Sequence, residues 1–192
     1  YGLSTETAPS LSSAREPMLD RTNSTNTSWV WTDFFDPANP GPTDTWTTDN
    51  PVNLVKLEGD PGDNNAKFFE AGQDEILQPF VDAGLVTIVA RQNIANWDET
   101  NAVIAMENIL TSQNNEVDAV IAANDNLGLG ALQALSAQQL SVPVSGQDAT
   151  VPGVNSIAKG QLTVTILKDY RVMAPQAVQL VDSFLNGETD PH

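Results

Sequence analysis

Polar side chains follow each of five short apolar runs in the sequence. The first run is followed by a stretch rich in Gly, Asp and Asn, the second by a stretch that ends in Trp97, and the last by Lys168. The five polar stretches are 58–66, 91–97, 124–126, 146–148 and 168–170. Singly, each fits ordinary turn and helix-capping duty, because Asp, Asn and Gly are common at such positions. Together they describe a polar rim with one aromatic platform.

This rim has the chemistry of a sugar site. Sugar hydroxyls both donate and accept hydrogen bonds, so carboxylate and amide side chains can engage neighbouring hydroxyls. Charged partners strengthen these hydrogen bonds. An indole ring can cover the apolar C–H face of a pyranose and remove it from water.

The apolar runs and the segments between them predict the fold that positions the rim. The apolar runs are 53–57, 85–90, 117–123, 142–145 and 162–167, and the helical patterns are 64–83, 98–111, 126–139, 151–159 and 172–185. Strands that alternate with helices require crossover connections and therefore a parallel sheet. We predict an α/β fold, a parallel five-stranded sheet with helices on both faces. Ligands bind such sheets outside the carboxyl ends of the strands, where the polar stretches lie.

Composition excludes several functional classes. The chain has 192 residues, with 25 acidic and 8 basic side chains and a net charge of −17, which disfavours nucleic-acid binding and docking on an anionic membrane. It has no Cys, and its single His is His192, so Cys- or His-based nucleophiles, triads and metal sites are excluded. The sequence shows no set of a nucleophile, a general base and a group that orients the base, as nucleophilic catalysis requires. An enzyme that works through paired carboxylates or a Lys stays possible, and the rim carboxylates could hold a cation, but we favour a binding protein that is not an enzyme and needs no cofactor or metal.

The chain divides into three parts by composition. Residues 1–50 are rich in Ser, Thr, Asn, Asp and Pro and are predicted to be irregular, 51–187 form the α/β unit, and 188–192 are a tail. The first part holds three of the four Trp residues, Trp29, Trp31 and Trp46, which we expect to pack on the body of the protein or on a partner. It also holds two N-x-S/T glycosylation triplets, at Asn23 and Asn26.

Three motifs resemble the periplasmic sugar-binding proteins of ABC transporters. They are Gly59-Asp60-Pro61-Gly62-Asp63-Asn64-Asn65-Ala66, then Val117-Asp118-Ala119-Val120-Ile121-Ala122-Ala123-Asn124-Asp125, and Val144-Ser145-Gly146-Gln147-Asp148-Ala149. The likeness covers about 52–187 and is greatest to the D-xylose-binding branch. It implies one lobe of the type I periplasmic-binding-protein fold, an extracytoplasmic location, a xylose-like pentose as ligand and a membrane transporter or sensor as partner.

The resemblance also implies roles for six residues. Asp63 and Asn65 match a hydroxyl-binding pair, Trp97 matches the ring that covers one sugar face, and Asn124 matches an amide after the third strand. Asp148 matches the carboxylate of the Gly-Gln-Asp turn, and Lys168 matches a lysine where the chain crosses between lobes. The alternative is structural: Asp63 and Asn124 could be helix caps, and Lys168 could be an ordinary surface lysine.

The resemblance is to one lobe of a two-lobed family that closes around its ligand. We expect residues 1–50 to be too short and too rich in proline to form the other lobe, and sugar affinity to be poor unless another chain completes the site. The apolar residues of the 172–185 helix would then lack their usual partner. We expect that helix to be covered by the Trp-rich segment or by a second chain, or to stay bare in a fragment.

Two other classes of function stay open at this point. The first is an extracellular interaction module that reuses one lobe and binds no sugar. The second is a nucleotide-dependent enzyme, because Gly128-Leu129-Gly130 follows a strand and opens a helix as a dinucleotide-binding loop does. However, Gln133 stands where that loop needs a third small residue, so close packing of helix and sheet is the favoured explanation for these glycines.

Overall fold

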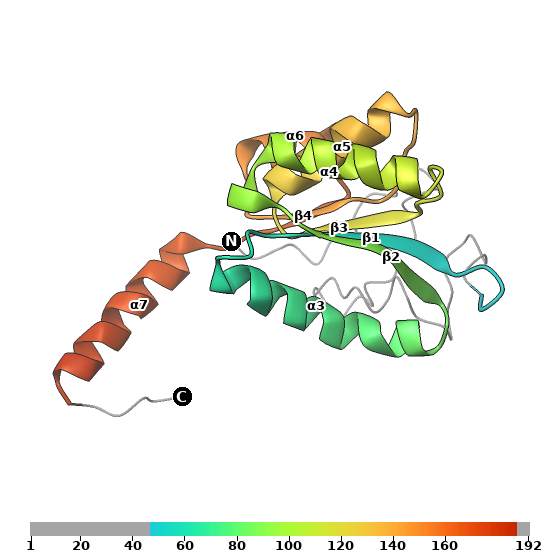
Figure 1. Ribbon diagram of the computed structural model, residues 1–192. Coiled ribbons are helices and arrows are strands. Elements are labelled where there is room, and N and C mark those ends of the chain that lie inside the picture. Colours follow the sequence, from blue (N-terminus) through green and yellow to red (C-terminus); the bar gives the residue numbers. More distant parts are fainter. Residues whose placement is uncertain (1–46, 188–192) are drawn as a thin grey trace, which may run out of the picture.

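Strands and helices alternate along the part of the chain that the structure, a computed structural model, describes: residues 47–187 (Figure 1). The elements in order are β1 (Val52–Glu58), α3 (Asn64–Asp82), β2 (Val86–Asn93), the short 3₁₀ helix η1 (Ala95–Trp97), α4 (Glu99–Ser112), β3 (Ala119–Ala122), α5 (Asp125–Ala137), β4 (Ser145–Gln147), α6 (Val151–Ala158), β5 (Val164–Ile166) and α7 (Tyr170–Leu185). The predicted α/β class is therefore confirmed. The expectations for Trp29, Trp31, Trp46, Asn23 and Asn26 lie outside the described residues.

The sheet is parallel, but its five strands are joined less evenly than predicted. β1 lies at the centre of a three-stranded sheet in the order β2-β1-β3, and β4 pairs with β5 separately. A single parallel bridge between Val120 and Val144 connects the two parts. The fourth strand begins at Ser145 instead of Val142. Pro143 has no N–H to donate, and its carbonyl accepts a hydrogen bond from the Val120 N–H, so regular pairing starts only after it.

Helices cover the two faces of the sheet unequally. Figure 1 shows α3 on one face and α4, α5 and α6 on the other. The larger core cluster contains Met106 and Leu110 of α4 and Leu127 and Leu135 of α5, and a smaller cluster that includes Leu77 lies under α3. The strands that carry both clusters, β1 and β3, are buried almost throughout, as expected for a sheet covered on both faces.

The glycines at 128 and 130 serve packing. A Cβ on Gly130 would lie 2.6 Å from the Glu99 carbonyl oxygen and 2.8 Å from Cβ of Ala102, so α4 and α5 approach closely at that point. A Cβ on Gly128 would lie 2.9 Å from the Ser145 carbonyl oxygen in β4. Both glycines lie inside α5, which argues against a phosphate-binding loop at this position.

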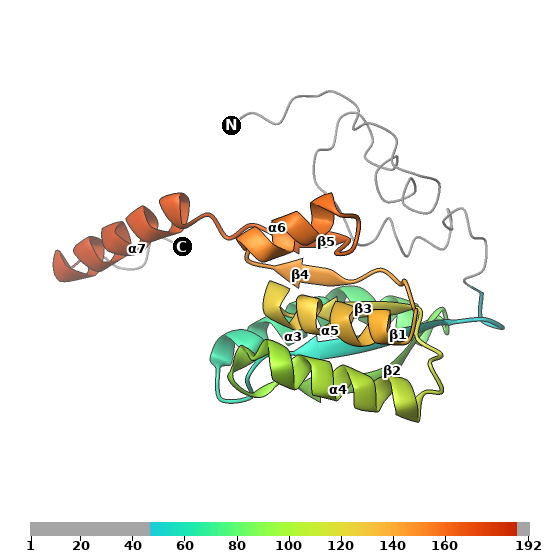
Figure 2. The same cartoon turned by 90° about the horizontal axis from the view of Figure 1, so that it is seen from above.

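The last helix leaves the body of the protein. α7 extends away from the sheet in both views (Figures 1 and 2), and Ser183 is its only residue that is not exposed. No helix or strand among residues 47–187 makes an extensive contact with it. Of the covers expected for this helix, the Trp-rich segment falls almost entirely outside the described residues, and the second chain stays a prediction.

Candidate functional site

Four side chains form a chain of contacts at the edge where the parallel strands end. In order they are Trp97, Phe69, Lys168 and Asp148. The indole of Trp97 contacts Phe69 edge to face, with ring centroids 6.3 Å apart and planes inclined at 70°. The Lys168 ammonium lies 5.2 Å from the centroid of the Phe69 ring, within cation–π range. It also pairs with Oδ1 of Asp148 at 2.6 Å. Three predicted site residues, from three separate loops, are thus brought together through a residue of α3.

Trp97 is held by an unusual turn after β2. Asn96 and Trp97 have φ angles of 59° and 54°, a left-handed conformation that is uncommon for residues other than glycine. Asp60, from the loop after β1, accepts a hydrogen bond from the Asn96 N–H at 2.6 Å and another from the Gly62 N–H at 2.7 Å. The hydrogen bond from the Asn96 N–H, and to a smaller extent the one from the Gly62 N–H, holds the pKa of Asp60 below its ordinary value. Asp60 therefore stays ionised and ties the first loop to the turn that carries the indole.

Asp148 occupies a similarly strained position after β4. Asp148 and Ala149 have φ angles of 101° and 50°. The Asp148 N–H donates to the Ile166 carbonyl at 2.8 Å, and the Ala149 N–H donates to Oγ1 of Thr165 at 3.0 Å. Strained backbone of this kind persists only where the surroundings fix it, and it often marks a ligand site.

A buried carboxylate fixes that strained loop. Asp125, fully buried at the start of α5, accepts hydrogen bonds from the N–H and hydroxyl of Thr150 at 2.7 and 2.8 Å and from the hydroxyl of Thr165 at 2.6 Å. Gly146 and Gly153 lie so close to its carboxylate that a Cβ on either would overlap with it. Asp125, which follows β3, thereby ties the loop after β4 to β5 at the edge that presents Asp148.

The other three predicted residues lie on the same edge, and two of them cap helices there. Asp63 is the N-cap of α3 and accepts a hydrogen bond from the Asn65 N–H at 2.8 Å. Asn124 is the N-cap of α5, where its side-chain oxygen accepts from the Leu127 N–H at 3.0 Å. Asn65 is exposed on the first turn of α3. The capping alternative is therefore realised for Asp63 and Asn124, and their sugar-binding roles stay predictions.

A buried network of charges holds α3, and with it Phe69, against the sheet. Lys56, which is fully buried in β1, pairs with Glu58 at 3.0 Å and with Asp74 of α3 at 2.6 Å. Arg91 of β2 pairs with the same Asp74 at 2.8 Å, with Glu58 at 3.3 Å and with Glu70 at 2.6 Å. Each of these three elements therefore contributes charge to one cluster.

The two central carboxyl groups of this cluster differ in their pKa. Burial raises the pKa of Glu58 above its ordinary value, and the hydrogen bond from Lys56 only partly opposes this. Its second oxygen, Oε2, is buried and has no hydrogen-bond partner among the described residues. Partial burial works to raise the pKa of Asp74 as well, but hydrogen bonds from Arg91 and Lys56 outweigh it and hold that pKa below its ordinary value.

Sequence reasoning missed Phe69, Asp60 and Asp125 as parts of this site. Phe69 has a detectable signal, because it lies one helical turn after Asn65 on the same helix. Asp60 and Asp125 were visible only as loop and capping residues, since their partners lie 36, 25 and 40 positions away in the chain.

The edge presents groups of the kind that contact a small polar ligand. It offers an aromatic surface, an ammonium and a carboxylate, with amide side chains nearby. Among residues 47–187, no three His, Cys, Asp or Glu side chains are placed to hold a metal ion. Within the same range, no helix has the length and apolar character to cross a membrane.

The parallel α/β unit and the polar rim at its carboxyl edge define one lobe of a type I periplasmic-binding-protein fold. The chain belongs to the periplasmic binding protein domain family, whose profile matches residues 43–189. The resemblance found in the motifs is therefore confirmed.

Two curated relatives and one solved structure illustrate the relationship. The D-xylose-binding periplasmic protein of Escherichia coli K12 is 45% identical over 138 residues, which are 71% of this chain and 42% of that protein. The multiple sugar-binding periplasmic protein SbpA of Azospirillum brasilense is 35% identical, over 72% of this chain and 43% of that protein. An ABC transporter solute-binding protein from Clostridium phytofermentans with bound β-D-glucose has a TM-score of 0.62 at 34% identity, covering 73% of this chain and 47% of that one. This chain thus spans about two fifths of the length of these curated relatives.

Proposed function

We propose that this chain supplies one half of a monosaccharide-binding site, with a xylose-like pentose as its ligand. In this proposal it acts as part of the solute-binding component of an ABC sugar transporter or sensor, outside the cytoplasm. It performs no catalysis. The observation that carries the proposal is the series of contacts from Trp97 through Phe69 and Lys168 to Asp148, which joins an aromatic surface to paired hydrogen-bonding charges.

Each member of that series has a role in the proposed site. Trp97 covers one face of the sugar ring, and Phe69 supports the indole from the side. Lys168 donates to sugar hydroxyls and Asp148 accepts from them, while their mutual ion pair keeps both side chains in place without the ligand. Asp63, Asn65 and Asn124 add acceptors and donors along the same edge.

The preference for a pentose rests on the relatives. The name of the 45% identical relative gives D-xylose, whereas the 35% identical relative is named as binding several sugars. The chain spans about two fifths of these relatives, so its edge covers only part of a ligand. We therefore expect an affinity on the order of millimolar for the chain alone.

The test is a titration of the full chain with D-xylose, followed by thermal unfolding and by the indole N–H signals in NMR spectra. Ligand at ten times its dissociation constant raises the stability by about 1.4 kcal/mol, and one of the four Trp signals should shift. Arabinose, ribose and glucose are the competing sugars. Tight, submicromolar binding by the chain alone would contradict the half-site, and no response to any sugar would contradict the function.

Matched variants assign the response to the proposed residues. Phe69→Leu should weaken binding, whereas Phe68→Leu should not, because Phe68 is its neighbour on α3 and is 71% exposed. Asp148→Asn should weaken binding, and Asp49→Asn at an exposed position should leave it unchanged. If both variants of a pair changed sugar affinity equally, the residue of that pair would not be part of the sugar site.

An interaction module without sugar binding is the second candidate function. The observation that favours it is α7, whose large apolar side chains are exposed along its whole length. Stable self-association together with no response to any sugar would select this alternative.

A further inference from the structure

A long groove lies between the end of β2 and α4. β2 is the outermost strand of the three-stranded sheet, so no other strand of the described residues covers this side. The groove has a volume of about 580 Å³ and is lined by residues 92–95 and by one face of α4 from Asn101 to Ser112. At a rise of about 1.5 Å per residue, this stretch of α4 is about 16 Å long. The volume falls within the range of about 300 to 1,000 Å³ that is usual for ligand pockets.

The groove is lined by amides and aliphatic side chains, and no charged residue lines it. Its polar side chains belong to Gln92, Asn93, Asn101, Asn108 and Ser112. An amide both donates and accepts hydrogen bonds, so these groups can serve the hydroxyls of a neutral ligand. Ile104, which is 53% exposed, adds an apolar surface that the C–H groups of such a ligand would remove from water.

Hydrogen bonds to the backbone hold three of these amides in place. Gln92 Nε2 donates to the Asn93 carbonyl at 3.0 Å, and Asn93 Nδ2 donates to the Gly59 carbonyl at 3.2 Å. Asn101 Nδ2 donates to the Ala95 carbonyl at 3.2 Å. Within residues 47–187, no group donates to the side-chain oxygens of these amides. The three oxygens are therefore acceptors at fixed positions, which lowers the entropic cost of binding a hydroxyl.

The groove adjoins the proposed sugar site. Ala95, which lines the groove, and Trp97 belong to the same short helix, η1. Asn93 holds the carbonyl of Gly59, and Gly59 lies directly against the indole of Trp97. A ligand that covers the indole at the rim can therefore continue into the groove.

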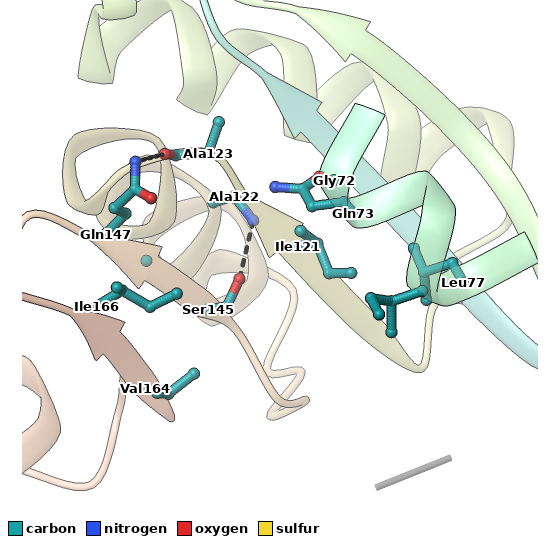
Figure 3. A pocket seen from close by; sticks show the side chains of 12 residues that line it. Gly72, Gln73, Leu77, Ile121, Ala122, Ala123, Ser145, Gln147, Val164 and Ile166 are labelled. Carbon is teal, nitrogen blue, oxygen red and sulfur yellow. Dashed lines mark hydrogen bonds between the residues drawn. The ribbon is translucent and has the colours of Figure 1, made fainter. Parts of the chain in front are cut away.

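The hollow beside α3 differs in both size and lining (Figure 3). Its volume of about 190 Å³ lies below the usual range for ligand pockets, and glycine, alanine and aliphatic side chains form most of its wall. Two of its polar side chains already bond to the backbone: the Ser145 hydroxyl accepts from the Ala122 N–H at 3.2 Å, and Gln147 Nε2 donates to the Ala123 carbonyl at 3.3 Å. It suits a polar ligand less well than the groove beside α4.

We propose that the groove beside α4 binds further units of a linear, neutral oligosaccharide whose terminal pentose lies on the rim at Trp97. This inference rests on the proposed sugar site and extends its ligand from one sugar unit to a short chain. The length of about 16 Å along α4 exceeds that of a single pyranose ring. Hydroxyls of the added units would bond to the amides, and their C–H groups would cover Ile104.

Calorimetric titration of the full chain with D-xylose and with xylotriose, a β-linked chain of the same sugar, tests the proposal. Because subsites that are joined through one ligand act together, xylotriose should bind at least about tenfold more tightly than D-xylose. Equal affinities would overturn the proposal but leave the proposed site for one pentose intact. No response to either sugar would contradict the proposed function, and this inference with it.

Asn108→Leu tests the groove itself. Asn108 is exposed, so the fold should tolerate the change, but the groove loses one of its amides. The variant should lose most of the advantage of xylotriose and keep the affinity for D-xylose. Thr111→Leu is the matched control, because Thr111 is exposed on α4 but does not line the groove. If both variants kept the advantage of xylotriose, the added units would lie elsewhere and the proposal would be wrong.

The side-chain amide signals of Asn108 in NMR spectra locate the added units. They should shift with xylotriose and not with D-xylose, because only the longer ligand reaches that part of α4. Signals that respond equally to both sugars, or to neither, would overturn the proposal.

Discussion

Gly59 lies against Trp97 so closely that any side chain at position 59 would have to displace the indole. A Cβ there would overlap with the six-membered ring of the indole. Gly59 follows β1, and Trp97 ends the turn after β2, so this contact joins two neighbouring strand ends. Together with the hydrogen bond from Asn96 to Asp60, it fixes where the indole lies on the rim.

Gly59→Ala should therefore move the indole without unfolding the lobe. We expect D-xylose affinity to fall at least tenfold, which corresponds to about 1.4 kcal/mol, because Trp97 no longer lies at the position that covers the sugar. Calorimetric titration measures the affinity, and the indole N–H signal of Trp97 reports the displacement.

The control for this variant is Gly62→Ala in the same loop. The only neighbour of a Cβ at Gly62 is Oδ1 of Asp60, at 3.0 Å, and that side chain can adjust. Unchanged binding in both variants would mean that the position of Trp97 does not matter to the ligand. Equal loss in both would trace the effect to the loop as a whole.

The alternation of strands and helices could be read from the sequence because the core patterns are local. β3 is a nearly continuous apolar run, and Asp98 and Asp63 are recognisable helix caps. The division between β3 and β4 was not predictable, since it depends on Pro143 and a single bridge. The same holds for the site: Trp97 and Lys168 stand out by residue type, whereas Asp125 acts through partners that only the folded chain brings near it.

Lys56→Met should destabilise the fold strongly. Lys56 is fully buried between Glu58 and Asp74, and its loss leaves the buried Glu58 carboxylate with only the 3.3 Å contact to Arg91. Removing one partner of a buried ion pair costs about 3 to 5 kcal/mol. Urea denaturation measures the change, with Lys67→Met at an exposed position of α3 as the matched variant. A loss below 1 kcal/mol would mean that water relieves the remaining charge.

The raised pKa of Glu58 predicts a specific pH dependence of stability. Because burial raises this pKa in the folded state, the folded chain binds more protons than the unfolded chain between the ordinary value of 4.5 and the folded value. The contribution of Glu58 to stability therefore falls as pH rises through that window and is constant above it. Asp74 acts oppositely, since its lowered pKa gives stability that is lost as pH falls below the ordinary value of 3.8.

Glu58→Gln isolates the first of these two effects. Relative to Glu58→Gln, the wild type should lose unfolding free energy as pH rises above 4.5. At higher pH the difference between the two should become constant. A flat difference for Glu58→Gln would show that Lys56 and Arg91 offset the burial of this carboxyl completely.

Asp125→Asn tests whether a buried carboxylate positions Asp148 from a distance. The variant keeps one acceptor oxygen but loses the charge that receives three hydrogen bonds from Thr150 and Thr165, which should cost about 2 kcal/mol of stability. Because Thr165 also accepts from the Ala149 N–H, the loop that presents Asp148 should loosen, and sugar affinity should fall several-fold. Asn126→Ala, exposed on the next residue of α5, is the comparison for stability. Amide exchange at Ala149 and Thr150 separates the two effects: faster exchange there, with the core of α4 still protected, identifies a positioning role. Uniform loss of protection would instead mean that Asp125 serves only the stability of the lobe.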